Sequence, residues 1–257
     1  MSIQRISSKQ AKTNVLLANS KLKDYIPATG HFDRSTVQRM LDQYGMIYVK
    51  PVVGTFGSGV IRIEKHPGTS SPYRFQSVVS KYSFRTFDEM YAKLGKVKKR
   101  KPYLVQKGIH MLKYNGRRFD LRVMVQMNPQ SRWESTGIIG RVAHPRKIVT
   151  NYHAGGTPLP VNRLMSGYLT AEQRNHFERR LRTLGITVAE ALKKKYPRIK
   201  EIGLDIAFDK SLKPWILEVN TSPDPFIFKK LPDRSVFRKI YSYAIAYGRF
   251  KPLKRKK

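Results

Sequence analysis

Two short apolar segments toward the end of the chain carry carboxylates at a spacing that suits a metal site. Residues 203–209 contain Asp205, and residues 214–220 contain Glu218 and Asn220. Both segments are predicted strands of one hairpin, in which Asp205 and Glu218 face each other with Cβ atoms about 5 Å apart. Two facing carboxylates repel unless a cation relieves the conflict. With the amide of Asn220 they offer three hard oxygens, which predicts a site for Mg²⁺ or Mn²⁺ that holds a nucleotide's phosphates.

The register of this hairpin follows from its turn. A four-residue turn at 210–213 pairs Asp209 with Pro214, and the same register pairs Asp205 with Glu218. Because side chains alternate across a strand, one face of each strand is predicted to be apolar: Leu204, Ile206 and Phe208 on the first, and Trp215, Leu217 and Val219 on the second. The alternative is an exposed hairpin with scattered charges. The chain has only 17 acidic residues, so two of them opposite each other favour the metal site.

A lysine at the end of a predicted strand, followed by glycines, is the second chemical feature. The strand 46–50 ends at Lys50, and the loop 51–59 carries Gly54, Gly57, Ser58 and Gly59. The loop lacks the Gly-Lys-Ser/Thr ending of a Walker A motif. Its backbone N–H groups can nevertheless converge on an anion, and Lys50 adds a positive charge. The loop therefore predicts a phosphate site that complements the metal site of the hairpin.

The elements that position these residues are a mixture of helices and strands. A helix over 35–44 has its apolar residues on one face, with Asp33 or Ser35 as its N-cap. Thr86 and Thr170 each begin a capping box that opens a helix, and a last helix runs from 235 to about 247. Further strands are predicted at 60–64, 73–79, 103–106, 119–127 and 133–142. Loops are predicted at 150–161 and at the basic stretch 93–101, which we place at the seam between two lobes.

Composition narrows the class of protein. The 257 residues include 40% hydrophobic and 11% aromatic residues, which is too apolar for a disordered basic tail. No apolar run is long enough to span a membrane. The first residues lack a signal peptide, so a cytoplasmic location is expected. The absence of cysteine excludes disulfides, thiolate zinc sites and a cysteine nucleophile.

The net charge of +34 favours a polyanionic partner, such as nucleic acid or an acidic polymer, over a merely solvated basic surface. Basic residues cluster at 93–101, 193–200 and 249–257. We expect these clusters to lie apart from the phosphate site and to bind polyanions without sequence preference, because no recognition motif accompanies them.

Together the lysine strand, the glycine loop and the carboxylate hairpin resemble the ATP-grasp superfamily. Within it, the chain is most similar to YheC/YheD-type endospore coat-associated proteins. The resembling segments are 48–60, 105–109, 116–123, 150–156 and 217–223. The resemblance implies an α+β fold of two lobes with ATP between them: a small lobe at about 35–105, a large lobe at about 106–247 and a basic tail at 248–257. It also implies that the N-terminal domain common among ATP-grasp ligases is absent or reduced.

By the same resemblance, Lys50 contacts the α- and β-phosphates of ATP, and the glycine loop forms a lid over them. A second phosphate-binding lysine is expected near the start of a helix, with Lys12 preferred and Lys9 as a rival. The hinge whose backbone meets adenine is expected at Gln106, Lys107, Gly108 and Ile109. ATP and Mg²⁺ or Mn²⁺ are the implied cofactors.

Arg122 and Arg141 are implied to help hold phosphate or acceptor, by similarity to RimK-type glutamate ligases. An ordinary salt bridge to Asp120 is an equally weighted alternative. The similarity also implies that Asn151, Gly155 and Gly156 bind the acceptor. His153 is expected to be a loop residue rather than a base.

Three functions follow from these features. The first is an ATP-dependent carboxylate–amine ligase that acts through an acyl-phosphate and needs no side-chain nucleophile. The second is a structural, spore-associated protein that binds nucleotide without turnover. The third is a module that binds polyanions through its charge.

Overall fold

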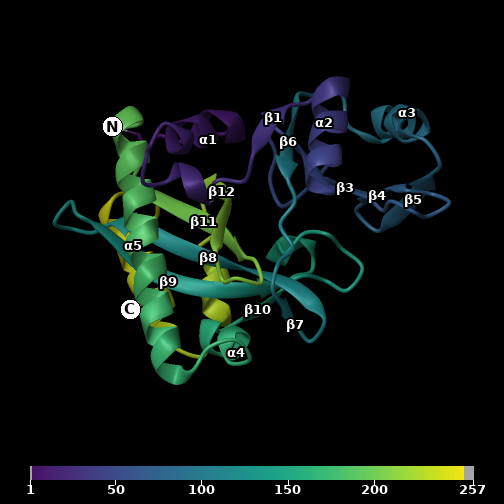
Figure 1. Ribbon diagram of the computed structural model, residues 1–257. Coiled ribbons are helices and arrows are strands. Elements are labelled where there is room, and N and C mark those ends of the chain that lie inside the picture. The colour runs from purple at the N-terminus through teal and green to yellow at the C-terminus, as the bar shows by residue number, and fades with distance from the viewer. Residues whose placement is uncertain (1, 252–257) are drawn as a thin grey trace.

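The computed structural model describes residues 2–251 and contains two antiparallel sheets with helices packed on both (Figure 1). The first sheet and its helices lie on one side of Figure 1, and the second sheet with its long helix lies on the other. This confirms the predicted α+β fold.

The first sheet has the strand order β1-β6-β2-β3-β4-β5. Helix α2 (Arg34–Tyr44) packs on β2, β3 and β6, and helix α3 (Phe87–Val97) packs on β4 and β5. The strands are β1 (Thr29–His31), β2 (Met46–Pro51), β3 (Ile61–Lys65), β4 (Tyr73–Ser77), β5 (Ser80–Phe84) and β6 (Tyr103–Lys107). The buried side chains of α2, α3 and these strands form one apolar cluster.

The second sheet has the order β10-β9-β8-β11-β12, with β7 paired to β8. Its strands are β7 (Lys113–Tyr114), β8 (Arg117–Met127), β9 (Trp133–Val142), β10 (Thr157–Leu159), β11 (Glu201–Phe208) and β12 (Pro214–Asn220). The remaining helices are α1 (Lys9–Leu17), α4 (Val161–Met165), α5 (Ala171–Lys195) and α6 (Arg234–Ala246), with 3-10 turns η1 (Lys23–Tyr25), η2 (Tyr152–Ala154) and η3 (Phe226–Lys230).

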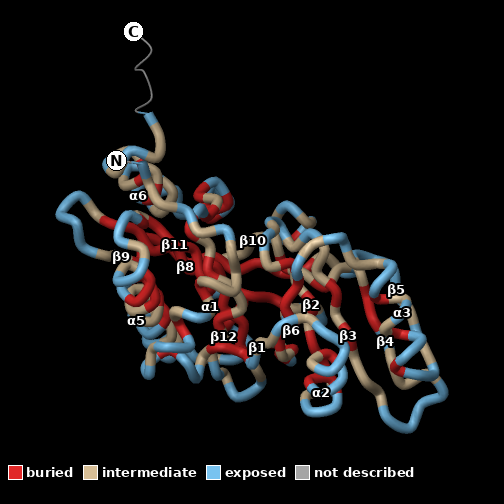
Figure 2. The backbone as a smooth tube through the Cα atoms, turned by 90° about the horizontal axis from the view of Figure 1, so that it is seen from above, coloured by how far each residue is buried: buried red, intermediate tan, exposed pale blue. Residues whose placement is uncertain are grey.

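The two faces of the second sheet are covered differently. On one face, α1 and α5 bury a large apolar cluster that includes Val123 and Leu204. On the other face, α6 and η3 cover Met124 and Ile139. Because side chains alternate along β8, Asp120 and Arg122 lie on the same face as Met124, beyond the part that α6 covers. Figure 2 shows the buried positions concentrated in the strands of both sheets.

Local sequence signals explain where most helices begin. Asp33 caps α2, and full capping boxes at Thr86 and Thr170 open α3 and α5, as predicted. The basic stretch 93–101 is not wholly a loop, because its first five residues extend α3, whose apolar face includes the buried Leu94. The short strands β1, β5 and β10 were not predicted. Among residues 2–251, no helix is both long and apolar enough to cross a membrane.

Candidate functional site

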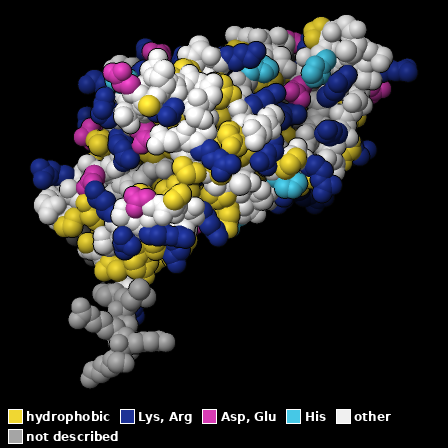
Figure 3. Space-filling view, turned by 90° about the horizontal axis from the view of Figure 1, so that it is seen from below, with side chains coloured by type: hydrophobic (Ala, Val, Ile, Leu, Met, Phe, Trp, Pro, Cys, Tyr) yellow, Lys and Arg dark blue, Asp and Glu magenta, His cyan; other side chains and the backbone are white. Residues whose placement is uncertain are grey.

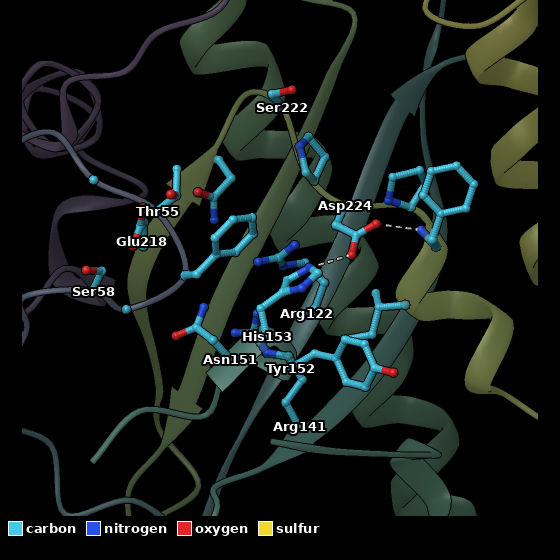
Figure 4. Close-up of a pocket in the computed structure, with 18 of the residues that line it drawn as sticks. Thr55, Ser58, Arg122, Arg141, Asn151, Tyr152, His153, Glu218, Ser222 and Asp224 are labelled. Carbon is cyan, nitrogen blue, oxygen red and sulfur yellow. Dashed lines mark hydrogen bonds and ion pairs between the residues drawn. The ribbon is translucent and has the colours of Figure 1, made fainter. Parts of the chain in front are cut away.

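A cavity of about 660 Å³ lies between the glycine loop and the uncovered face of the second sheet (Figure 4). Lys9 and the loop from Gly54 to Ser58 line one side of it. The sheet contributes Arg122, Arg141, Glu218 and Asn220, and the opposite end is formed by Tyr152, His153, residues 222–227, Lys229, Lys230, Arg249 and Phe250. The two features that the sequence marks for phosphate and metal therefore face one space.

The carboxylate hairpin has the predicted pairing of Asp205 with Glu218, but an irregular register elsewhere. Phe208, rather than Asp209, pairs with Pro214, because a bulge between Asp205 and Ile206 places one extra residue, Leu217, on β12. The bulge interrupts strict alternation.

The predicted faces of β12 hold for Glu218, Val219 and Asn220 but are wrong for Ile216 and Leu217, for this reason. Ile216 and Val219 both enter the core, whereas Leu217 lines a second cavity beside Glu218. The bulge thus turns two consecutive side chains toward the site. The predicted apolar face of β11 is confirmed, since Leu204, Ile206 and Phe208 all lie in the core cluster.

Asp205 lies in a buried cluster of charges on three neighbouring strands. Its Oδ1 accepts a hydrogen bond from Arg122 Nε at 2.6 Å and pairs with Arg141 Nη2 at 3.0 Å. Arg141 also donates to both carboxylate oxygens of Asp120. The alternative role as a salt bridge is therefore present for both arginines, with Asp120 as the partner of Arg141 but Asp205 as the partner of Arg122, although both arginines also line the larger cavity. The charge of Asp205 is balanced by arginines, so its position opposite Glu218 does not by itself demand a metal ion.

These contacts shift the ionisation of the cluster. Burial would raise the pKa of Asp205, but Arg122 and Arg141 outweigh it and lower that pKa to about 2. Burial raises the pKa of Asp120 despite the attraction of Arg141. Asp205 therefore remains an anion at neutral pH and keeps its oxygens available as acceptors.

Glu218 pairs with a lysine from the first helix. Lys9 Nζ lies 3.0 Å from Glu218 Oε1 and also donates to the carbonyl of Gly54 at 2.8 Å. Lys12 instead is buried, and its Nζ donates to the carbonyl of Ile6 at 2.8 Å. Lys9, the rival in the sequence prediction, thus lines the cavity, and Lys12 lines neither cavity.

Two of the three predicted metal ligands, Asp205 and Glu218, share their oxygens with cations. Glu218 and Asn220 line the larger cavity, and Asp205 lines a narrow cavity of about 80 Å³ that adjoins it. Within residues 2–251, no cluster of three or more His, Cys, Asp or Glu residues is arranged to hold a metal. Carboxylate and amide oxygens are nevertheless the donor set that suits Mg²⁺.

The narrow cavity is lined by half of the predicted nucleotide contacts, including Lys50 and most of the expected adenine hinge. Lys50, Gln106, Lys107 and Ile109 line it, together with Tyr48, Met111 and residues 148–151. Lys50 Nζ donates to Gln106 Oε1 at 2.5 Å. Burial lowers the pKa of Lys50 to about 8, against the opposing effect of nearby carboxylates led by Glu218.

Gly108 has a structural role in the hinge. It is not among the residues that line either cavity, and its N–H donates to the carbonyl of Met46. A Cβ at this position would lie 2.6 Å from Met46 Cγ. The N–H of Lys107 is likewise used, by the carbonyl of Ala28. Two backbone N–H groups of the expected adenine hinge therefore already have partners in the fold.

The glycine loop rests on the second sheet's loop at 149–153. Gly57 has φ +73°, and a Cβ there would lie 2.9 Å from Asn151 Oδ1 and 3.0 Å from Val149 Cγ1. Phe56 packs against His153, with 4.3 Å between ring centroids. Ser58 Oγ accepts a hydrogen bond from Lys99 at 3.0 Å. Glycine at 57 is what lets the loop approach this closely.

The predicted acceptor residues divide into two groups. Asn151 lines both cavities. Gly155 and Gly156 line neither: Gly155 has φ +87°, and a Cβ on Gly156 would lie 2.1 Å from the carbonyl oxygen of Thr150. These two glycines shape the turn that presents Asn151.

The far end of the larger cavity contains residues that sequence reasoning missed. His153, expected to be an ordinary loop residue, pairs with Asp224 at 3.1 Å, and both line the cavity (Figure 4). Asp224 follows the Glu-x-Asn motif closely, so proximity to that motif could have indicated it.

Arg249 also lines the cavity and pairs with the buried Glu201 at 2.8 Å. The expectation that the basic tail lies apart from the site is therefore wrong for Arg249 and Phe250. No local sequence signal indicates these two residues. The expected tail beyond Lys251 lies outside the described residues.

Comparisons with known proteins bear on the family and the fold of this chain. A family model described as YheC/D like ATP-grasp matches residues 3–250. The endospore coat-associated protein YheD of Bacillus subtilis (strain 168) is 23% identical over 233 residues, covering 88% of this chain and 48% of YheD. YheC from the same organism is 24% identical over 211 residues, covering 81% of this chain and 57% of YheC. The chain thus spans about half the length of these curated relatives.

A solved structure shares the fold. The C-terminal domain of K. lactis Pby1, an ATP-grasp enzyme interacting with the mRNA decapping enzyme Dcp2, aligns with a TM-score of 0.55 at 15% identity. The alignment covers 99% of this chain and 78% of that domain's chain, and this likeness bears on the fold alone. From the family model, this chain belongs to the YheC/D-like ATP-grasp family.

Proposed function

We propose that this protein binds ATP with Mg²⁺ in the two adjoining cavities and couples a carboxylate to an amine through an acyl-phosphate. The observation that carries the proposal is that Lys9, Lys50, the glycine loop and the carboxylates of β11 and β12 converge on one continuous site. Family membership supports ATP as the nucleotide.

The nucleotide would lie with its base toward Gln106 and Ile109 and its phosphates under the glycine loop. Lys50 lies near the end of β2 and lines the narrow cavity, and it would neutralise the phosphates nearest the base. Lys9 bridges Glu218 and the carbonyl of Gly54, so it lies between the metal-ligand strand and the loop. A bound phosphate would compete for this lysine and for the loop's N–H groups.

Glu218, Asn220 and Asp205 would hold the metal ion. Both ion pairs of Asp205 use Oδ1, which supports a role for its other oxygen as a ligand. When bound, Mg²⁺ would supply charge neutralisation for the phosphates. The arginines beside Asp205 hold it as an anion, and this keeps the ligand charged at neutral pH.

In the proposed reaction, a carboxylate oxygen of the substrate attacks the γ-phosphorus of ATP, and ADP leaves. An amine then attacks the acyl carbon, phosphate leaves with the electron pair of the C–O bond, and the amine loses a proton. Arg122 and Arg141 line the cavity on the sheet side and would stabilise the negative charge that develops on the transferred group. Asn151, which touches both cavities, would position the acceptor.

Product analysis tests this proposal. The protein is incubated with ATP, Mg²⁺ and a mixture of amino acids, and the products are identified by mass spectrometry. ADP together with a new amide supports the ligase. Bound nucleotide with no ADP after prolonged incubation would refute turnover and favour the second candidate.

The second candidate is a structural, spore-associated protein that binds nucleotide without turnover. It is favoured by the names of the two relatives, both described as endospore coat-associated. The charge supports a third role, polyanion binding, since Lys and Arg side chains are spread widely over the face in Figure 3 and acidic ones are few. A salt titration of DNA binding would test that role.

A further inference from the structure

A basic hollow of about 460 Å³ lies where the first sheet meets the second, separate from the two cavities of the proposed ATP site. Cationic side chains dominate its lining, and no acidic residue is among them. The cations are Arg62, Lys81, Arg118, Arg146 and Lys147. They come from β3, β5, β8 and the loop after β9, so the sequence does not reveal them as a cluster.

The walls of this hollow are held by specific contacts. Gln76 is 7% exposed, and its side-chain amide donates to the carbonyls of Val78 and Arg146 at 3.0 and 2.7 Å. This buried amide fixes the loop that carries Arg146 and Lys147 against the first sheet. The shape of the hollow is therefore maintained by buried hydrogen bonds at the junction between the sheets.

The positive charge of the hollow is poorly compensated. Arg62 pairs with Glu64 at 3.1 Å, and it is the one cation of the five with a carboxylate partner among residues 2–251. The Nε of Arg62 is buried without a hydrogen-bond partner in that same range. Like charges held this close repel, and an unsatisfied buried donor costs free energy. The repulsion is removed if an anion fills the hollow.

We propose that this hollow binds a compact oligophosphate, an anion with two or three linked phosphate groups. Such an anion carries several negative charges in a small volume, whereas a single carboxylate would compensate one of five cations. Arginine guanidinium groups also match phosphate oxygens with paired N–H donors. The enclosure between two sheets favours a compact ligand over an extended polymer.

The location links this site to the proposed nucleotide cavity. Arg118 Nη1 donates to the hydroxyl of Tyr48 at 3.4 Å, and Tyr48 lines the narrow cavity. Residues 148–151, which also line the narrow cavity, directly follow Lys147. An oligophosphate that draws Arg118 and Lys147 toward itself would therefore shift residues beside the narrow cavity and change nucleotide affinity, and by linkage nucleotide would change oligophosphate affinity by the same factor.

Calorimetric titration with inorganic tripolyphosphate tests the site. The test variant is the double substitution Lys81→Gln and Arg146→Gln, because both side chains are exposed and Gln76 contacts only the backbone of Arg146. The control is Arg179→Gln with Arg180→Gln, which removes the same charge from exposed positions on α5 outside the three basic clusters. Titrations are run with a saturating non-hydrolysable ATP analogue and Mg²⁺ to block the ATP site, and also without it.

With the analogue present, the wild type should bind one tripolyphosphate. The test variant should lose about tenfold in affinity and the control less than about twofold. An equal loss in both variants would show that net charge alone drives binding and would overturn the proposal. The proposal would also be overturned if the wild type did not bind tripolyphosphate in the presence of the analogue. It would be overturned as well if the test variant lost affinity for duplex DNA but kept its affinity for tripolyphosphate. If the analogue itself does not bind, the titrations without it give the answer. Tripolyphosphate binding by the wild type that is weakened in the test variant supports the proposal, and equal binding by both proteins overturns it.

Discussion

Two buried carboxylates on β11, Asp205 and Glu201, have similar partners but different surroundings. Each pairs with two arginines: Asp205 with Arg122 and Arg141, and Glu201 with Arg5 at 2.6 Å and Arg249 at 2.8 Å. Both lie on the same face of the strand, four residues apart.

The difference lies in what covers each pair. Glu201 is fully buried beneath segments from both ends of the chain, and Tyr247 also donates to it at 2.6 Å. Asp205 lies where α6 no longer covers the sheet, and its arginines line the larger cavity. Between the two carboxylates, Gly203 has no side chain, and a Cβ there would lie 2.7 Å from Pro223 Cβ. A carboxylate paired with two arginines is thus enclosed by the fold at the Glu201 end of β11, whereas the same arrangement at the Asp205 end faces the cavity.

Asp205→Asn should have the largest effect on ligand binding. The substitution keeps the shape but removes the charge that the two arginines and the proposed metal share. We expect Mg·ATP affinity to fall by about 100-fold. Calorimetry on the folded variant measures this, with circular dichroism to verify folding. If the Mg·ATP affinity of the variant stayed within twofold of the wild type, Asp205 would have no larger role in ligand binding than the enclosed Glu201 at the other end of β11.

Glu201→Gln should have the opposite profile. It leaves two arginines without their buried counter-charge, so the free energy of unfolding should fall by about 3 kcal/mol. Mg·ATP affinity should change less than twofold. Denaturant unfolding gives the first value and calorimetry the second. The control is Asp88→Asn, which removes an exposed ion pair with Arg34 and should cost less than about 0.5 kcal/mol.

Gly57→Ala tests whether the glycine loop must approach the sheet near the Asp205 end. The new Cβ would meet Asn151 and Val149 at a positive φ, so the loop should be displaced and Mg·ATP affinity should fall by about tenfold. Gly54→Ala is the matched control, because its Cβ would lie 3.6 Å from Pro51 in ordinary contact. Hydrogen exchange at 56–60 should show protection on nucleotide binding in the wild type and the control. Equal losses of affinity in both variants would argue against a specific contact at residue 57.

The pKa of Lys50 predicts a smaller, pH-dependent effect. Its pKa is lowered from 10.5 to about 8, so the unliganded protein loses this positive charge as pH rises through 8, and nucleotide affinity should fall several-fold between pH 7 and pH 9. The unfolded chain binds this proton more tightly, so the Lys50 contribution to stability is unfavourable below pH 8 and improves between pH 8 and 10.5. Lys50→Arg should retain its charge and flatten the affinity profile. An identical profile in this variant would assign the titration to another group.

The sequence contained enough information for the local elements of the fold. Capping residues such as Asp33 and Thr170 marked helix starts, and alternation on β11 identified its core face. The pairing of Asp205 with Glu218 was predicted correctly, although the predicted turn was offset by one residue, because the bulge at Leu217 compensates for that offset. The bulge at Leu217 was not predictable from the alternation of apolar and polar residues, because Leu217 is an apolar residue like those that a regular strand would carry.

Contacts between distant segments were harder to predict. Arg122 and Asp205 are 83 positions apart, and no local pattern couples them. Lys12 was preferred to Lys9 as the phosphate-binding lysine, but it is Lys9 that pairs with Glu218 and lines the cavity. The two lysines lie about one turn apart on α1, and the sequence alone does not show which of them points at Glu218. Arg249 reaches the site because Glu201 and the carbonyl of Pro223 hold it there.

Calorimetric titration of Mg·ATP into Glu218→Gln is the sharpest test of the proposed nucleotide–metal site, because Glu218 touches Lys9 and lines both cavities. We expect Mg·ATP affinity to fall at least tenfold while the free energy of unfolding changes by less than about 1 kcal/mol, since Glu218 is half-buried rather than enclosed. Unchanged Mg·ATP affinity in a correctly folded variant would contradict a nucleotide–metal site between the two sheets.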